Sequence, residues 1–201
     1  MPALFYFFFI LGAILFKLKV FIGFVELMSL PLLLITSSIV LISLFRAGCI
    51  RLLWWGLAVY VIVMALEAIS VHTGLVFGTY TYHNMLGISV FGVPLIIGIL
   101  WITITASSIS VAGLIQKNIY TKALLAGIIA TAFDAVMEQA VLRLRFWQWQ
   151  DNYIPLQNYI MWFSVVFLVS LLYQKIIIVQ NNRLAIHYLI SQFIFFGIVA
   201  L

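Results

Sequence analysis

The chain has 201 residues, of which 66% are hydrophobic and only 7% are charged, and its formal net charge is +5. A soluble domain carries about 25% charged residues, so a chain with this composition and a mean hydropathy of +1.26 needs lipid as its solvent. The positive charges occur in scattered pairs such as Lys17/Lys19 and Arg143/Arg145, a pattern typical of the ends of membrane spans and not of a nucleic-acid-binding surface.

A helix needs about 20 apolar residues to cross the hydrocarbon core of a bilayer. The apolar runs of this chain are continuous and do not alternate with every second residue, which favours helices over a β-barrel. Cutting the chain at its charges predicts seven spans, at residues 2–16, 25–45, 52–69, 90–113, 122–142, 157–175 and 184–201. The first run is short, so six spans are the alternative. We therefore predict an all-α, polytopic integral membrane helical bundle that lies in the cell membrane and forms a single transmembrane domain over residues 1–201.

One segment interrupts this pattern with polar side chains. Residues 67–87, EAISVHTGLVFGTYTYHNMLG, contain a carboxylate, two histidines, two tyrosines and three glycines. The order of the spans puts this segment at the same end of the bundle as residues 143–158, RLRFWQWQDNYIPLQN. Every acidic residue of the chain falls at or just inside that end: Glu26, Glu67, Asp134, Glu138 and Asp151. Because the glycines favour a tightly folded or re-entrant segment, which needs protein or a wet cavity beside it, we predict a pocket at one membrane face.

The acidic residues inside the spans are the first candidates for function, because ionisable groups are costly in a membrane. Asp134 and Glu138 are four residues apart, on one face of their predicted helix. Two close carboxylates in a low-dielectric site do not both ionise easily, so one is expected to keep a proton and serve as general acid while the other serves as general base. Glu67 is the third candidate. The alternative is a structural role, in which the acids pair with basic neighbours: Arg143, Arg145, His72 or His83.

Two segments near these acids alternate aromatic with polar residues. Tyr80 and Tyr82 share one side if their segment is extended, and so do Trp147 and Trp149. Such rings form either an ordinary aromatic belt at the membrane interface or the lining of an apolar tunnel that stabilises a passing cation. The histidines and acids could bind a metal, but the chain has no Glu-x-x-His pair of the di-iron type and no HExxH motif. We therefore predict no metal site.

Five segments resemble, in the same order, those of the membrane-bound carotenoid biosynthesis family: EAISVHTGLVFGTYTYHNMLG, GVPLIIGILW, DAVMEQA, FWQWQ and IPLQNYIMWF. The resemblance covers about residues 60 to 170. Members of that family include bisanhydrobacterioruberin hydratase and related carotenoid 1′,2′-hydratases. The resemblance implies a hydro-lyase that needs no cofactor and adds water to the terminal double bond of an acyclic carotenoid such as lycopene. In that reaction a carboxyl group protonates the alkene, and water captures the resulting tertiary cation.

In such an enzyme, Asp134 and Glu138 would form the acid–base pair, with Glu67 as a proton relay or third carboxylate. His72 and Asn158 would position water. Aromatic side chains would form the walls of the substrate cavity: Tyr80, Tyr82, Trp147, Trp149 and Trp162. The implied partners are a lipid-soluble carotenoid, membrane lipids and other carotenoid biosynthesis enzymes, with no nucleic acid among them.

Three other functions fit parts of the pattern. A carotenoid end-group cyclase would protonate the same double bond and then close a ring in a drier pocket. A small proton-coupled transporter would also bury acids among its helices. Such transporters often have inverted repeats with broken helices in both halves, whereas only the region between residues 69 and 90 is interrupted here. A non-catalytic scaffold would leave the clustered carboxylates unexplained.

Overall fold

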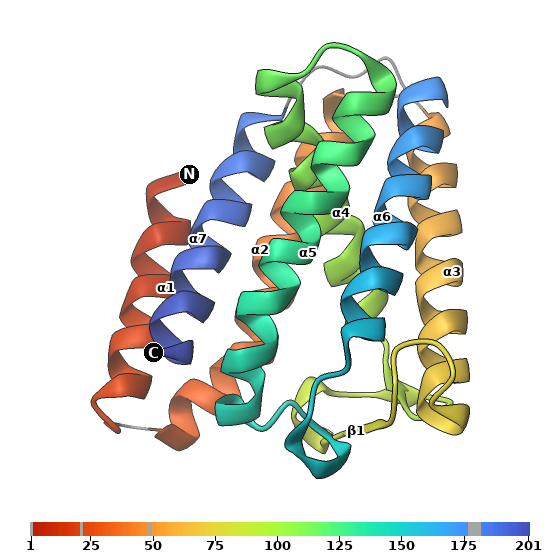
Figure 1. The fold of residues 1–201 in the computed structure, drawn as a ribbon. Coiled ribbons are helices and arrows are strands. Elements are labelled where there is room, and N and C mark those ends of the chain that lie inside the picture. The colour runs from red at the N-terminus through yellow and green to blue at the C-terminus, as the bar shows by residue number, and fades with distance from the viewer. Residues whose placement is uncertain (1, 21, 48–49, 177–181) are drawn as a thin grey trace.

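The computed structural model describes residues 2–20, 22–47, 50–176 and 182–201. Seven α-helices fill most of these residues (Figure 1), and each corresponds to one predicted span. They are α1 (Pro2–Lys17), α2 (Ile22–Ala47), α3 (Ile50–Thr73), α4 (Ile96–Ile115), α5 (Ile119–Leu144), α6 (Leu156–Ile176) and α7 (Arg183–Ala200). The predicted all-α helical bundle is confirmed.

Six helices of the described residues, α2 to α7, are long and apolar enough to cross a membrane. Helix α1 has 16 residues, which at 1.5 Å per residue gives a length of about 24 Å. This is less than the roughly 30 Å thickness of the hydrocarbon core. The chain is a multi-pass integral membrane protein, and its helix lengths favour the lower of the two predicted span counts.

Helix α4 lies in the middle of the bundle, between α3, α5 and α7 (Figure 1). Its serines and threonines are buried together with its apolar residues. The hydroxyls of Thr103 and Ser110 donate to the carbonyl oxygens of Ile99 and Ala106 one turn earlier, at 2.8 Å and 2.9 Å. Such small side chains let neighbouring helices approach closely, so α4 is suited to being covered by protein on all sides.

The start of α4 is the one helix boundary that differs clearly from its prediction. The span was predicted from residue 90, but α4 begins at Ile96 because a short hairpin precedes it. Strands β2 (Ser89–Val90) and β3 (Val93–Pro94) pair in antiparallel fashion across Phe91 and Gly92, which both have positive φ, at 52° and 78°. The hydropathy pattern does not predict this hairpin, because its residues are almost all apolar and continue the hydrophobic run of the helix.

Candidate active site

Two distant segments meet in a small sheet at one end of the bundle, the lower end in Figure 1. Strand β1 (Tyr80–Tyr82) pairs in antiparallel fashion with β4 (Trp147–Trp149), so that Tyr80 lies opposite Trp149 and Tyr82 lies opposite Trp147. Side chains alternate along a strand, so the four rings share one face of the sheet. The paired rings are in contact, with centroids 4.7 Å apart for Tyr80 and Trp149 and 5.6 Å apart for Tyr82 and Trp147.

Backbone turns bring each strand into place. Helix α5 ends at Arg145, whose left-handed conformation (φ 56°) turns the chain into β4. Before β1, Gly78 has a φ of +115°, and a Cβ atom there would lie 2.6 Å from Cγ of Pro155 and 3.2 Å from a ring atom of Trp149. Only glycine fits such a position. The side chain of Ser70 fixes the same turn, because its Oγ donates to the Gly78 carbonyl oxygen at 3.1 Å.

A cavity lies between this sheet and the helices α3 to α6. Its polar wall contains Glu67, Asp134, Glu138 and Asn158, and the four aromatic side chains of the sheet also line it. The cavity has a volume of about 30 Å³, which is room for about two water molecules. The three carboxylates are almost completely buried, with exposed fractions of 3% for Glu67, 0% for Asp134 and 3% for Glu138.

Each strand of the sheet supplies two hydrogen-bond donors to one glutamate. Oε2 of Glu67 accepts hydrogen bonds from the hydroxyls of Tyr80 and Tyr82, the second at 2.8 Å. Oε2 of Glu138 accepts hydrogen bonds from the indole nitrogens of Trp147 at 3.1 Å and Trp149 at 2.6 Å. Because of the strand register and the alternation of side chains, the small sheet holds two carboxylates. Each carboxylate accepts two hydrogen bonds at a single oxygen atom.

The two tyrosines remain donors over a wide pH range. Burial raises the pKa of Tyr80 and of Tyr82 well above the usual value, and the neighbouring Glu67 carboxylate raises it further. Both hydroxyls therefore keep their protons and donate hydrogen bonds to Glu67. This explains how the Glu67 carboxylate and two phenols share a small space in which its hydrogen bonds from the described residues come from neutral donors.

The carboxyl group of Asp134 is held differently from those of the glutamates. Its Oδ2 accepts a hydrogen bond from the amide nitrogen of Asn158 at 2.8 Å. Its Oδ1 is buried and has no hydrogen-bond partner within the described residues. A buried charged oxygen without a partner is costly, whereas a protonated oxygen at the same place is tolerated more easily. Asp134 therefore accepts one hydrogen bond from an amide, whereas Glu138, one helical turn later, accepts two from indoles.

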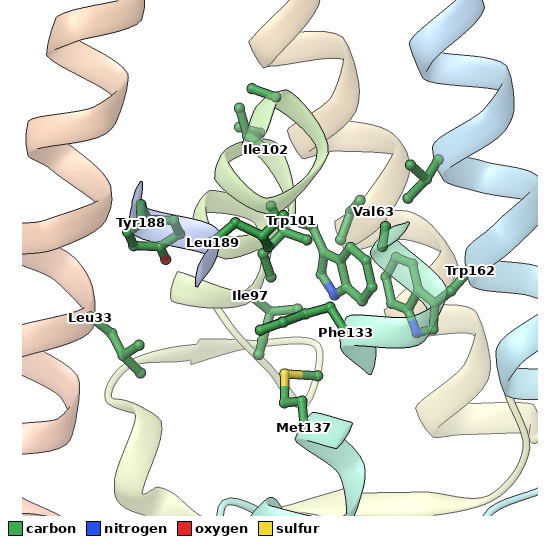
Figure 2. Close-up of a cluster of buried hydrophobic side chains, with 14 of the residues drawn as sticks. Leu33, Val63, Ile97, Trp101, Ile102, Phe133, Met137, Trp162, Tyr188 and Leu189 are labelled. Carbon is green, nitrogen blue, oxygen red and sulfur yellow. The ribbon is translucent and has the colours of Figure 1, made fainter. Parts of the chain in front are cut away.

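Apolar and aromatic side chains form the remainder of the cavity wall, mostly from α4. Ile97, Leu100, Trp101 and Ile104 follow helical spacing on one face of α4 and line the cavity. The indole rings of Trp101 and Trp162 lie side by side (Figure 2), with ring centroids 3.4 Å apart and an interplanar angle of 11°. Phe77 also stacks on Trp162, at 4.5 Å and 14°.

Nine of the ten side chains predicted for the site line this cavity: Glu67, Tyr80, Tyr82, Asp134, Glu138, Trp147, Trp149, Asn158 and Trp162. The tenth, His72, was predicted to position water but is exposed near the end of α3 and is not among the lining residues. It follows Glu67 by five residues, a rotation of about 140° around the helix axis. The structure therefore places His72 away from the cavity lining.

The predicted structural alternative, in which the acids pair with basic side chains, is not what the described residues form. Arg143, Arg145, His72 and His83 are all exposed. The hydrogen bonds of the three buried carboxylates go instead to tyrosine, tryptophan and asparagine. Of the other two acids, Asp151 is exposed beside β4, and the side chain of Glu26 lies outside what the structure describes.

Trp101 and Phe77 are not among the residues predicted for the site. Trp101 ends the segment GVPLIIGILW, and its spacing from Ile97 and Ile104 was the available signal. That signal was weak because α4 is buried on nearly every side, so no polar face marks the cavity side by contrast. As for metals, no three histidine, cysteine or acidic side chains in the described ranges are arranged to hold one ion.

Fold and site together define a multi-pass membrane protein whose cavity, called the chamber below, is lined by buried carboxylates and aromatic rings. The family model described as carotenoid biosynthesis protein matches residues 27–201, a range that includes every residue lining the chamber. The chain therefore belongs to the carotenoid biosynthesis protein family, as the five sequence segments predicted. No curated protein and no solved structure gives a significant match to the chain. Membership supports an enzymatic role in carotenoid biosynthesis.

Proposed function

We propose that this protein is a carotenoid end-group hydratase, which adds water to the terminal carbon–carbon double bond of an acyclic carotenoid such as lycopene. One observation carries the proposal: three buried carboxyl groups share a cavity with room for water, and each has an oxygen that its hydrogen-bonding side chains leave free. The family supplies the class of substrate. A lipid-soluble substrate also accounts for a catalytic chamber built from membrane helices.

In the first step, Asp134 donates a proton to the less substituted carbon of the double bond. The electron pair of the π bond forms the new C–H bond, and the other carbon becomes a tertiary cation. The buried Oδ1 of Asp134 supports this assignment, because it has no partner within the described residues to stabilise a negative charge. Asn158 holds the other oxygen and so orients the carboxyl group. General acid catalysis of this kind contributes about 10²- to 10⁴-fold in rate.

In the second step, a water molecule attacks the tertiary cation and gives its proton to Glu138. A tryptophan N–H can only donate a hydrogen bond, so two of them on one oxygen suit an ionised Glu138. Its second oxygen remains available for the water. The products are a tertiary alcohol, an ionised Asp134 and a protonated Glu138. Transfer of that proton back along one helical turn restores the starting state.

Glu67 would act as the third carboxylate, which orients water and relays the returning proton. Its two tyrosine partners both bind Oε2 and leave the other oxygen without a bond to either of them. The complete reaction combines one alkene and one water into one alcohol, and it neither consumes protons nor transfers electrons. The reaction as written requires no cofactor.

The cavity favours hydration over the alternative of ring closure. A cyclase would need water to be excluded from the cation, whereas a polar cavity with two or more hydrogen-bonding groups and enough room normally holds water. Here carboxylate oxygens line a space of about 30 Å³. A proton-coupled transporter would use similar acids, but the family match favours an enzyme.

The test is expression of the chain in a heterologous host that accumulates lycopene, followed by mass spectrometry of the pigments. Hydration predicts a product heavier than the substrate by one or two water molecules. An isomer of unchanged mass would indicate cyclisation and contradict the proposal. Unchanged pigment despite membrane-inserted protein would contradict both enzymatic activities.

Two isosteric variants test the acid–base assignment, with an exposed acid as the control. Asp134→Asn and Glu138→Gln keep the side-chain shapes but remove the proton donor and the base, so each should lose at least about 100-fold in rate. Asp151→Asn changes an exposed carboxyl group outside the cavity lining, and it should keep the parent rate. Normal turnover by both cavity variants would contradict the assignment.

A further inference from the structure

We infer that Trp101 supplies the aromatic face that stabilises the tertiary carbocation. The inference rests on the proposed function only in requiring that a cation forms, and it holds whether water captures that cation or a ring closes on it. The negative face of an aromatic ring attracts a cation, most strongly for tryptophan and where water is excluded. A ring that stabilises the cation in this way needs a face that no other ring covers.

The four rings of the small sheet are engaged in other contacts. Tyr80 and Tyr82 turn their hydroxyl edges toward Glu67, and Trp147 and Trp149 turn their N–H edges toward Glu138. The rings pack against one another: Tyr80 is tilted against Trp149 at an interplanar angle of 48°, and Tyr82 lies edge-on to Trp147 at 70°. These four rings are positioning residues for the two glutamates.

Trp162 also lines the chamber, but both of its faces are occupied. Trp101 is nearly parallel to it at a centroid distance of 3.4 Å, and Phe77 is nearly parallel to it at 4.5 Å. Two parallel rings at such distances cannot share one face of an indole, so they lie on opposite faces. Trp162 therefore presents only an edge to the substrate.

Among the described residues, Trp101 stacks on another ring through one face only, the face toward Trp162. Its covered face rests on Trp162, as Figure 2 shows. Its side chain lines the same cavity as the three carboxylates and is only 4% exposed. The nearby lining residues Ile97, Ile104 and Met137 carry no charge and no strong dipole to compete for the cation. The stack behind it holds the indole in place before the cation forms, which makes the electrostatic stabilisation more effective.

The test is to replace Trp101 site-specifically with mono-, di- and trifluorotryptophan and to measure turnover of an acyclic carotenoid. Each fluorine withdraws electron density from the ring face while hardly changing its shape, so the fold is retained. The logarithm of kcat is expected to fall with each fluorine, reaching a loss of roughly tenfold for the trifluoro ring. KM should change little, because the neutral substrate does not use this attraction.

A matched position separates this role from a packing role. Trp55 is equally buried, but its indole donates to the Val169 carbonyl oxygen at 3.0 Å and lies outside the cavity lining. The same fluorinated series at Trp55 should leave kcat within about twofold of the parent.

The results distinguish this inference from the proposal on which it rests. An active parent whose kcat does not respond to fluorination at Trp101 would overturn the role of Trp101 alone. A response of equal size at Trp55 would overturn it as well, by assigning the effect to packing. A parent that transforms no acyclic carotenoid would overturn the proposed function and this inference together.

Discussion

Replacing Trp149 with phenylalanine should impair catalysis much more than its small loss of atoms suggests. The substitution keeps a ring against Tyr80 but removes the 2.6 Å hydrogen bond from the indole to Oε2 of Glu138. Removing a hydrogen bond to a charged group costs about 1.5–3 kcal/mol. If Glu138 must be held in place to receive the proton of water, removing this hydrogen bond raises the free energy of the transition state by about the same amount. The expected decrease in kcat is about 10- to 150-fold.

The longer hydrogen bond from Trp147, at 3.1 Å, should be worth less. Trp147→Phe is therefore expected to fall at the lower end of the same range. Turnover of lycopene by purified protein in detergent, followed by chromatography of the pigments, measures both variants. Trp55→Phe is the control, because it removes an equally buried indole hydrogen bond that goes to a backbone carbonyl outside the cavity.

The reasoning would be refuted if Trp149→Phe kept at least half of the parent rate. It would also be refuted if Trp55→Phe lost as much activity as Trp149→Phe, since the effect would then follow from general loss of packing. Size-exclusion chromatography of each variant in the same detergent establishes that the compared proteins are folded.

Three further predictions concern residues at the edge of the site. The pKa values of Tyr80 and Tyr82 are raised, so both tyrosines stay neutral at higher pH. Replacing both with phenylalanine should therefore leave the tyrosinate absorbance that appears around pH 10 unchanged. A loss of that absorbance would contradict the burial of the two hydroxyls. Gly78→Ala should lower the thermal stability in detergent by several degrees and reduce turnover, because an added Cβ has no room and φ is positive. The control is Gly197→Ala, where nothing lies within 4 Å of the added Cβ, and it should match the parent in stability and turnover. His72→Ala should keep the parent rate in the pigment assay because His72 is exposed outside the cavity, and a tenfold loss would show that it takes part in the reaction.

The fold could be predicted from the sequence because lipid imposes a simple pattern on it. Continuous apolar runs between charges gave all seven helices, and the only marked boundary error was at α4. There the mostly apolar residues 88–95 form a hairpin, and hydrophobicity alone cannot distinguish an apolar hairpin from the first turns of a helix. The positive φ of Phe91 and Gly92 depends on local backbone geometry that a hydropathy profile does not contain.

The candidate site could be predicted in its members but not in its contacts. The helical spacing of Asp134 and Glu138, and the order of the spans for Glu67, placed the three acids at one end of the bundle. The hydrogen bonds of the tyrosine and tryptophan pairs depend on β1 pairing with β4, and these strands are three residues long and far apart in the chain. No local pattern specifies such a pairing, so the hydrogen bonds that these cavity-lining rings donate could not be predicted from the sequence.

The most direct test of the central claim is to run the reaction in deuterium oxide enriched in oxygen-18 and to locate the labels in the product. Protonation by a cavity carboxyl group followed by capture of water predicts one deuterium on the carbon beside the new carbinol and one oxygen-18 in its hydroxyl group. Asp134→Asn should form neither labelled bond at a measurable rate. A product that carries deuterium but no added oxygen, or an alcohol whose oxygen does not come from water, would contradict the account.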